Sequence, residues 1–256
     1  MQPHRKELTL MSDTAIKAEN VSMMFNLSRE KEVRLKEYVI NLLKHKLFFD
    51  EFWALKDISF EVKKGDSLGL VGTNGAGKTT LLKLVSGIMR PTSGTLTTEG
   101  SIAPLFAMGT GFDSSLTARE NIFLVGSMRG FSKKYMQKHF DEIIDFAELD
   151  NFVDVPLRNY SSGMSSRLAF AIATLVKTDI LIADEVLAVG DAKFRKKSEE
   201  RMNKMIDNGV TILFVSHSSA QVQKVCKNAI WLDHGKLIKS GPAKEICKEY
   251  DEFCKK

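Results

Sequence analysis

A glycine-rich octapeptide at residues 72–79 constrains this chain more than any other feature. It follows an apolar run at 68–71 and precedes a helical run at 80–86, so it joins a predicted strand to a predicted helix. The pattern GxxxxGK[ST] in that context is typical of a phosphate-binding loop, because its glycines let the backbone wrap closely around phosphate oxygens. We expect the residues that contact a bound nucleotide to be Gly72, Thr73, Asn74, Gly75, Ala76, Gly77, Lys78, Thr79 and Thr80.

Two side chains of this loop carry the expected chemistry. Lys78 is placed to reach the β and γ phosphates of ATP, and the Thr79 hydroxyl is placed to bind Mg²⁺. The alternative, a chance glycine-rich turn, is disfavoured by the strand before the loop and the helix after it. The loop therefore predicts ATP and Mg²⁺ as cofactors, but it is shared by many enzymes and does not predict the reaction.

Composition narrows the class of protein. With 256 residues and 43% apolar side chains, the chain can bury a sizeable core. Its apolar runs are far shorter than the ~18 to 20 residues of a membrane-spanning helix, and its start lacks the apolar stretch of a signal peptide. Three cysteines without a CxxC pair disfavour a disulfide framework or a zinc site. These features predict a globular protein of the cytosol. The net charge of +5 does not by itself indicate a class of partner.

Hydrophobic periodicity predicts how the chain is organised around the loop. We expect a disordered tail at 1–14, one domain at 15–242 and a C-terminal segment at 243–256 that holds a short helix. The expected parts, in chain order, are strands at 16–25 and 58–62 with an amphipathic helical insertion at 28–49 between them, a turn at 64–66, a helix-rich region at about 114–175, and buried strands at 180–183 and 211–215.

Four further segments are weak signals when each is taken alone. Asp184 and Glu185 end a buried strand, although such a pair is usually a solvated turn. Ser161-Ser162-Gly163 precedes a helical run and fits an ordinary helix N-terminus with a serine cap. Asp191 lies in a short loop, and His217 follows the apolar strand, where a lone histidine is more often structural than catalytic.

The order of these segments resembles that of the ABC ATPases, and the resemblance covers residues 15–240. It implies an α/β fold: a P-loop NTPase cassette with a RecA-like core, a small antiparallel β subdomain and a helical subdomain at 113–170. It also implies that two copies dimerise.

Specific roles follow from that resemblance. Asp184 holds Mg²⁺ together with Thr79, and Glu185 is the general base that activates water, with His217 as the switch histidine. Ser161, Ser162 and Gly163 form the signature that contacts the γ-phosphate on the other subunit, and Asp191 lies in the D-loop. Phe25 matches the aromatic residue that stacks on adenine, with Phe52 and Trp53 as rivals. One position departs from the family pattern: Ala107 stands where most members have the Q-loop glutamine, which puts the link from nucleotide to permease in doubt.

The particular residues at 160–164 and 184–191 are similar to those of the ABC subfamily that exports bacterial surface polysaccharides on lipid carriers. That resemblance implies a separate membrane permease, in two copies, and a peripheral place on the cytoplasmic face of the bacterial cell membrane, without nucleic acid as a partner. The insertion at 28–49 carries six Lys or Arg and three Glu around an apolar stripe, so it either meets the membrane surface or packs on its own domain. Since the chain ends at Lys256, we expect no carbohydrate-binding domain after the ATPase. The alternatives are a soluble ABC ATPase that acts on ribosomes or nucleic acid, and an ABC subunit for a different exported substrate.

Overall fold

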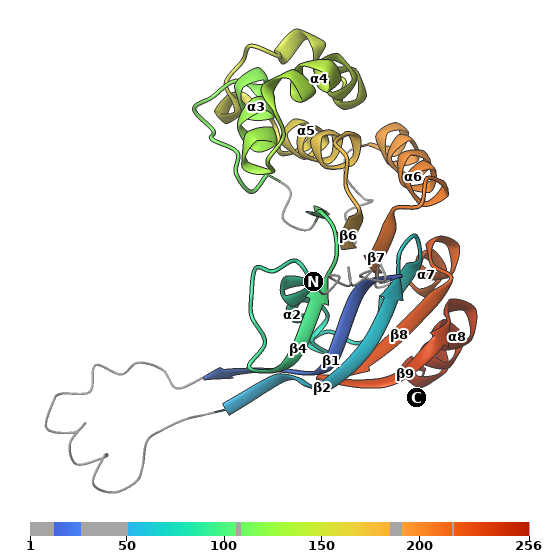
Figure 1. Cartoon of the computed structure of the whole chain (residues 1–256). Helices are drawn as coiled ribbons and strands as arrows, with labels where there is room; N and C mark the ends of the chain where they lie inside the picture. The colour runs from blue at the N-terminus through green and yellow to red at the C-terminus, as the bar shows by residue number, and fades with distance from the viewer. Residues whose placement is uncertain (1–12, 27–50, 106–108, 185–190, 217, 256) are drawn as a thin grey trace, which may run out of the picture.

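The computed structural model describes residues 13–26, 51–105, 109–184, 191–216 and 218–255. The predicted insertion at 28–49 lies outside the described residues, as do residues 1–12 of the predicted tail. The first strand, β1 (Thr14–Asn26), begins one residue before the predicted start of the domain at residue 15. Figure 1 shows a helical lobe above a sheet-containing body.

A six-stranded sheet forms the centre of the body, with strand order β5-β6-β7-β3-β8-β9. All neighbouring pairs are parallel except the β8–β9 hairpin. The strands are β3 (Ser67–Val71), β5 (Ile102–Pro104), β6 (Ile180–Asp184), β7 (Thr211–Val215), β8 (Asn228–Asp233) and β9 (Lys236–Pro242). Every residue of β3 and β7 is buried, which explains why these strands are continuous apolar runs without alternation.

A second, antiparallel sheet has the order β2-β1-β4, with β2 spanning Glu51–Lys63 and β4 spanning Ser93–Thr98. The predicted turn at 64–66 leads from β2 into β3, and Gly65 takes a left-handed φ of 76° there. Helix α2 (Lys78–Val85) packs in one apolar cluster with β1, β2, β3 and β7. The helix that follows the glycine-rich loop is therefore enclosed by both sheets.

The lobe at the top of Figure 1 consists of three helices and two short 3-10 turns. They are α3 (Ala118–Met128), α4 (Lys133–Ala147), η2 (Asp150–Phe152), η3 (Leu157–Asn159) and α5 (Ser162–Leu175). Helix α5 joins the lobe to the body, because Leu168 and Ile172 pack within the lobe while Phe170 and Ala173 pack against the central sheet. The helix ends at Leu175, where the expected helix-rich region ends, and the subdomain limit expected at 170 falls within it.

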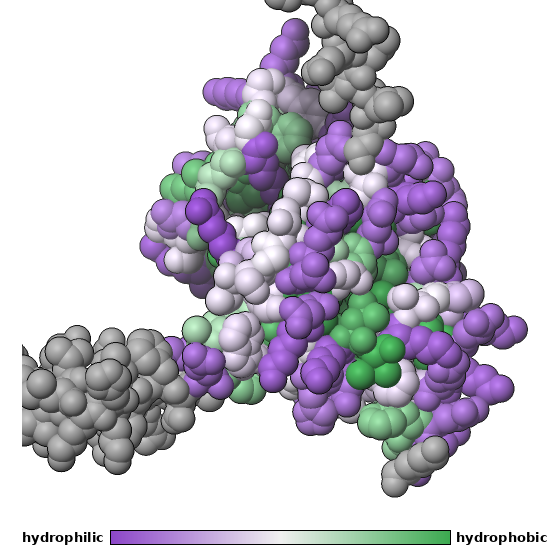
Figure 2. All heavy atoms as spheres, turned by 60° about the horizontal axis from the view of Figure 1, so that its bottom comes forward, coloured by the Kyte–Doolittle hydropathy of each residue, from purple (hydrophilic) through white to green (hydrophobic). Residues whose placement is uncertain are grey.

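Helices α6 (Ala192–Asp207), α7 (Ser219–Val225) and α8 (Ala243–Cys254) contribute to the apolar cluster on one face of the central sheet. Helix α8 is the short C-terminal helix expected from the sequence. Figure 2 shows that the lower side of the molecule is largely hydrophilic and is interrupted by a hydrophobic strip. Across the described residues, none of the helices has the length and apolar character needed to cross a membrane.

Candidate nucleotide-binding site

A cavity of about 600 Å³ lies where β6 and β7 end, with their last residues Asp184 and Val215 in its wall. Its other described lining residues are Phe52, Ala54, Asn74, Gly75, Ala76, Gly77, Lys78, Thr79 and Thr80. Ligands of parallel α/β sheets bind outside the carboxyl ends of the strands. The structure thus brings residues 74–80 and Asp184, which are more than 100 residues apart in the chain, to one cavity.

Lys78 is held by the loop to which it belongs. Its side-chain nitrogen donates hydrogen bonds to the carbonyl oxygens of Gly72 at 2.6 Å and Thr73 at 2.9 Å. The residue is only 8% exposed, and a buried ammonium group needs such partners. These contacts fix a positive charge at the wall of the cavity, where phosphate oxygens would bind.

Two glycines of the loop cannot be replaced without strain. Gly77, just before α2, has a φ of 103°, and a Cβ atom there would lie 2.7 Å from the carbonyl oxygen of Ala54. A Cβ atom on Gly72 would collide with the carbonyl oxygen of Leu232. The glycine spacing of the sequence pattern is therefore required by the packing of the loop against β2 and β8.

The β8–β9 hairpin also holds the loop in place through hydrogen bonds. Thr73 Oγ1 donates to Asp233 at 3.3 Å, and the Gly235 amide donates to the Ala76 carbonyl oxygen at 3.1 Å. The Gly235 carbonyl oxygen in turn accepts a hydrogen bond from the backbone amide of Lys56 in β2 at 2.7 Å. Sequence reasoning missed Asp233 and Gly235, because no motif connects a hairpin at 233–236 to a loop 160 residues earlier.

Thr79 and Asp184 supply oxygen donors to the same cavity. A hydroxyl and a carboxylate suit Mg²⁺, which takes few protein ligands and completes its shell with phosphate oxygens and water. Within the described ranges, no group of three or more His, Cys, Asp or Glu side chains gathers as a metal site. The residues present therefore fit a metal that arrives with a nucleotide better than a metal held by the protein alone.

The aromatic residue in the cavity wall is Phe52, which is 47% exposed. Phe25, the residue expected to stack on adenine, lies opposite Phe52 in the β1–β2 register but is not one of the described lining residues. Trp53, the other rival, faces Met24 in the register, and its indole nitrogen donates to Glu51 at 3.2 Å. Of the three candidates, Phe52 is the one among the described lining residues of the P-loop cavity.

The segment 161–163 begins α5, as expected. Ser161 is the N-cap, and its hydroxyl accepts a hydrogen bond from the Met164 amide at 3.2 Å. Ser162 is exposed, and a Cβ atom on Gly163 would meet only the Ser161 hydroxyl, at 3.8 Å. Ser161 is also exposed and Gly163 is partly exposed, and none of the three is among the described lining residues of the P-loop cavity.

Asp191 occupies the same position at α6 that Ser161 occupies at α5. It is the N-cap, and its carboxylate accepts from the Phe194 amide at 2.8 Å. That hydrogen bond is the main reason why the pKa of Asp191 is lowered, with smaller contributions from Arg167 and Lys193. The carboxylate is therefore charged and held in place. Glu185, His217 and Ala107 lie outside the described residues.

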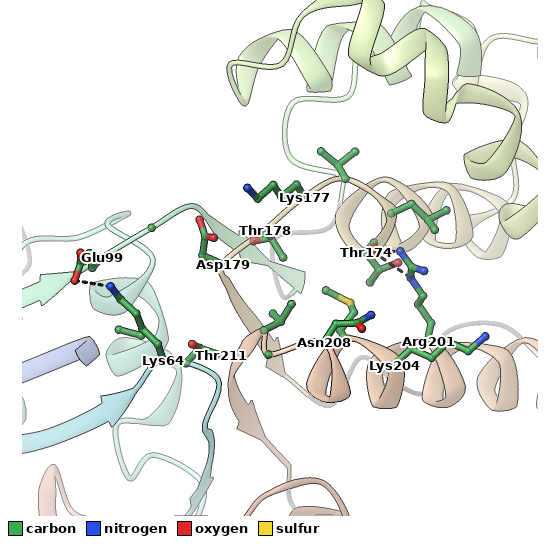
Figure 3. Close-up of a pocket in the computed structure, with 17 residues that line it drawn as sticks. Lys64, Glu99, Thr174, Lys177, Thr178, Asp179, Arg201, Lys204, Asn208 and Thr211 are labelled. Atoms are coloured by element: carbon green, nitrogen blue, oxygen red, sulfur yellow. Dashed lines mark hydrogen bonds and ion pairs between the residues drawn. The ribbon is translucent and has the colours of Figure 1, made fainter. Parts of the chain in front are cut away.

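A larger cavity, of about 720 Å³, lies at the opposite end of the central sheet, beside the first residues of β6 and β7 (Figure 3). Several of its charged groups already have partners. Lys64 pairs with Glu99 at 3.1 Å, and the Arg201 guanidinium donates to the Thr174 carbonyl oxygen at 2.7 and 3.1 Å. The P-loop lies at the other end, so this cavity is not the nucleotide site.

A P-loop between a central strand and helix, a strand-end carboxylate beside it and a separate helical lobe define an ATP-binding cassette ATPase. Residues 55–188 match the family model described as ABC transporter. An O-antigen export system ATP-binding protein, RfbB of Klebsiella pneumoniae, is 45% identical over 79% of this chain and 82% of its own length. The chain belongs to the ABC transporter family, and it is an ATPase of that family.

Other relatives are longer than this chain. A teichoic acids export ATP-binding protein, TagH of Bacillus anthracis, is 42% identical over 94% of this chain, which spans 43% of its length. TagH of Listeria innocua is 43% identical over 80% of this chain, which spans 61% of its length. The chain thus corresponds to only part of these proteins.

Solved structures agree on the fold. The ATP-binding subunit of an ABC transporter superposes with a TM-score of 0.73 at 21% identity, covering 93% of this chain and 94% of that one. A dimeric ATP-binding cassette bound to ADP and phosphate superposes with a TM-score of 0.71 at 22% identity, covering 89% and 98%. The predicted fold class is confirmed.

Proposed function

We propose that this chain is the ATP-hydrolysing subunit that drives export of a lipid-linked bacterial surface polysaccharide of the O-antigen, capsule or teichoic acid type. It works as a homodimer on a separate membrane permease, at the cytoplasmic face of the cell membrane. The support for the substrate class is the set of relatives at 42–45% identity, whose names describe export of O-antigen and of teichoic acids.

The observation that carries the dimer is the division of the site. One subunit gathers its P-loop and Asp184 in a single cavity, while the N-termini of α5 and α6 lie outside that cavity. A helix N-terminus is a favourable place for a phosphate group, because its free amides and dipole are positive. In the proposed dimer, Ser161, Ser162 and Gly163 of one subunit contact the γ-phosphate that Lys78 of the other subunit holds.

Hydrolysis then needs a positioned water molecule. We assign the general base to Glu185, with His217 as its switch partner, by the family resemblance of these residues. Asp184 and Thr79 would hold Mg²⁺, which would supply positive charge beside the phosphates. Replacing Glu185 by Gln should leave ATP binding intact and lower the hydrolysis rate by roughly 10²-fold or more, the scale expected for loss of a general base. Hydrolysis at the native rate would place the base elsewhere.

The physiological test is deletion of the gene in its source bacterium. Surface polysaccharide should disappear and the lipid-linked polymer should accumulate inside the cell. The wild-type gene should restore export, and Lys78→Ala, expressed at the same level, should not. Unchanged surface polymer together with a defect in translation would instead favour the alternative, a soluble ABC ATPase that acts on ribosomes.

A further inference from the structure

The carboxylate of Glu148 lies among three cations that come from two other helices. Its oxygens lie 3.5 Å from Arg167 Nη1 of α5, 3.5 Å from Lys193 Nζ of α6 and 3.6 Å from Lys197 Nζ of α6. We propose that Glu148 is a positioning residue for ATP hydrolysis, which holds the N-terminal ends of α5 and α6 in a fixed relation. This inference rests on the proposed dimeric ATPase, in which both helix ends act on the partner's nucleotide.

The backbone conformation of Glu148 is unusual for a glutamate. The residue is the C-cap of α4, with a left-handed conformation at φ 57° and ψ 50°. Glycine or asparagine is the usual residue there, since a side chain with a Cβ atom adds steric cost in this region. A glutamate in that conformation places a carboxylate beside α5 and α6 at the expense of backbone energy.

The cations around Glu148 are themselves anchored. Lys197 donates to the carbonyl oxygens of Phe146 at 2.9 Å and Asp145 at 3.3 Å, both in the last turn of α4. The Arg167 guanidinium lies 5.9 Å from the centre of the Phe194 ring of α6. An isolated exposed ion pair contributes little, but these contacts join three helices in one network.

Helix electrostatics favour a carboxylate at this position. Neither α5 nor α6 has an acidic residue in its first turn, and Lys193 lies in the first turn of α6. A cation near the positive end of a helix is unfavourable, and an anion there is favourable. Asp191 already places a carboxylate at the N-cap of α6, and Glu148 adds a second negative charge from α4 that contacts both α5 and α6. Its contacts therefore favour one placement of the two helix ends.

Both of those ends carry residues assigned to the partner's ATP. Arg167 lies six residues after Ser161, and Lys193 lies two residues after Asp191. Glu148 is not among the described residues that line the P-loop cavity. Its loss should therefore misplace the groups that act on the partner's γ-phosphate and leave the nucleotide affinity of its own subunit unchanged.

The test compares Glu148→Gln, which keeps the shape of the side chain, with Glu148→Asn, which suits the left-handed backbone. For both we expect kcat of ATP hydrolysis to fall about tenfold, since small misplacements of catalytic groups carry costs of this order or more. The Kd for ATP and the thermal midpoint should stay close to those of the wild type. Asp150→Asn removes an exposed carboxylate two residues away and should leave kcat unchanged. Glu148→Asp, which keeps the charge, should restore part of the rate.

Several outcomes would overturn the inference. A wild-type kcat in Glu148→Gln and Glu148→Asn would show that the network has no part in hydrolysis. A loss of ATP affinity in proportion to kcat, or failure of both variants to fold, would show that Glu148 is structural. A wild-type protein that does not hydrolyse ATP would instead count against the proposed function, so the two failures are distinguishable.

Discussion

The side-chain nitrogen of Lys78 donates a hydrogen bond of 2.6 Å to the carbonyl oxygen of Gly72, the first residue of the same loop. The loop thus fixes the charge that its ligand needs. A group positioned before the substrate binds costs little reorganisation when charge develops in the transition state. Gly72 and Gly77 pack closely against neighbouring carbonyl groups, and this packing sets the path of the loop. The position of Lys78 therefore depends on the two glycines.

The first prediction concerns the adenine contact. Because Phe52 lines the cavity and Phe25 is not among its described lining residues, we expect Phe52→Ala to weaken ATP binding by about 1–3 kcal/mol, the usual value for loss of an aromatic stack on a base. Phe25→Ala, on the neighbouring strand, should have a smaller effect. Titration of both variants with a fluorescent ATP analogue measures this, and the reverse order would return the stacking role to Phe25.

The second prediction concerns the strain at Gly77. Gly77→Ala combines an unfavourable φ of 103° with a Cβ atom 2.7 Å from the Ala54 carbonyl oxygen. Gly87→Ala is the matched control, because Gly87 has a φ of 73° and nothing within 4 Å of the added atom. We expect Gly87→Ala to lower the free energy of unfolding by about 1–2 kcal/mol, the cost of the left-handed conformation alone. Gly77→Ala should lower it further and abolish ATP binding. Urea unfolding measures both changes, and an equal decrease in the free energy of unfolding for the two variants would refute the steric explanation.

The third prediction concerns pH. The pKa of Asp179 is lowered from 3.8 because its carboxylate accepts hydrogen bonds from the Ser101 amide at 2.7 Å and the Ser101 hydroxyl at 2.8 Å. A carboxyl whose pKa is lower in the folded state stabilises the fold above its unfolded pKa, and this contribution is lost as the pH falls through the folded value.

Asp179→Ala should therefore be less stable than the wild type at neutral pH, and the difference should narrow as the pH falls below about 3.8. Urea unfolding at a series of pH values measures the difference. A gap that widens on acidification would show that these hydrogen bonds do not stabilise the charged carboxylate.

The sequence alone predicted the parts of this fold that local patterns encode. The strand–loop–helix at 68–86 and the buried strand ending at Asp184 could be predicted because each lies in a short segment of distinctive residues. The Ser161 cap could be predicted for the same reason. The choice between Phe25 and Phe52 could not be made, since it depends on where the β1–β2 register places each ring.

Contacts between distant segments could not be predicted from the sequence either. The bracing of the loop by Gly235 and the cluster around Glu148 join residues with no shared motif, because tertiary packing alone brings them together. The glutamate itself gives no signal, as it stands where a helix ends and where glycine is more usual.

The central claim is that each ATP site is built from two subunits, and mixing two inactive variants tests it most directly. Lys78→Ala removes the phosphate-binding charge. Gly163→Asp adds a carboxylate at the start of α5, where the added Cβ atom would meet only the Ser161 hydroxyl, at 3.8 Å, and where a helix tolerates an anion. Each variant alone should fold but hydrolyse almost no ATP. Mixed in equal amounts, they should recover about one quarter of the wild-type rate, because half of the dimers then contain one intact site of two. If native mass spectrometry shows mixed dimers and the mixture stays as inactive as its components, the composite site is wrong.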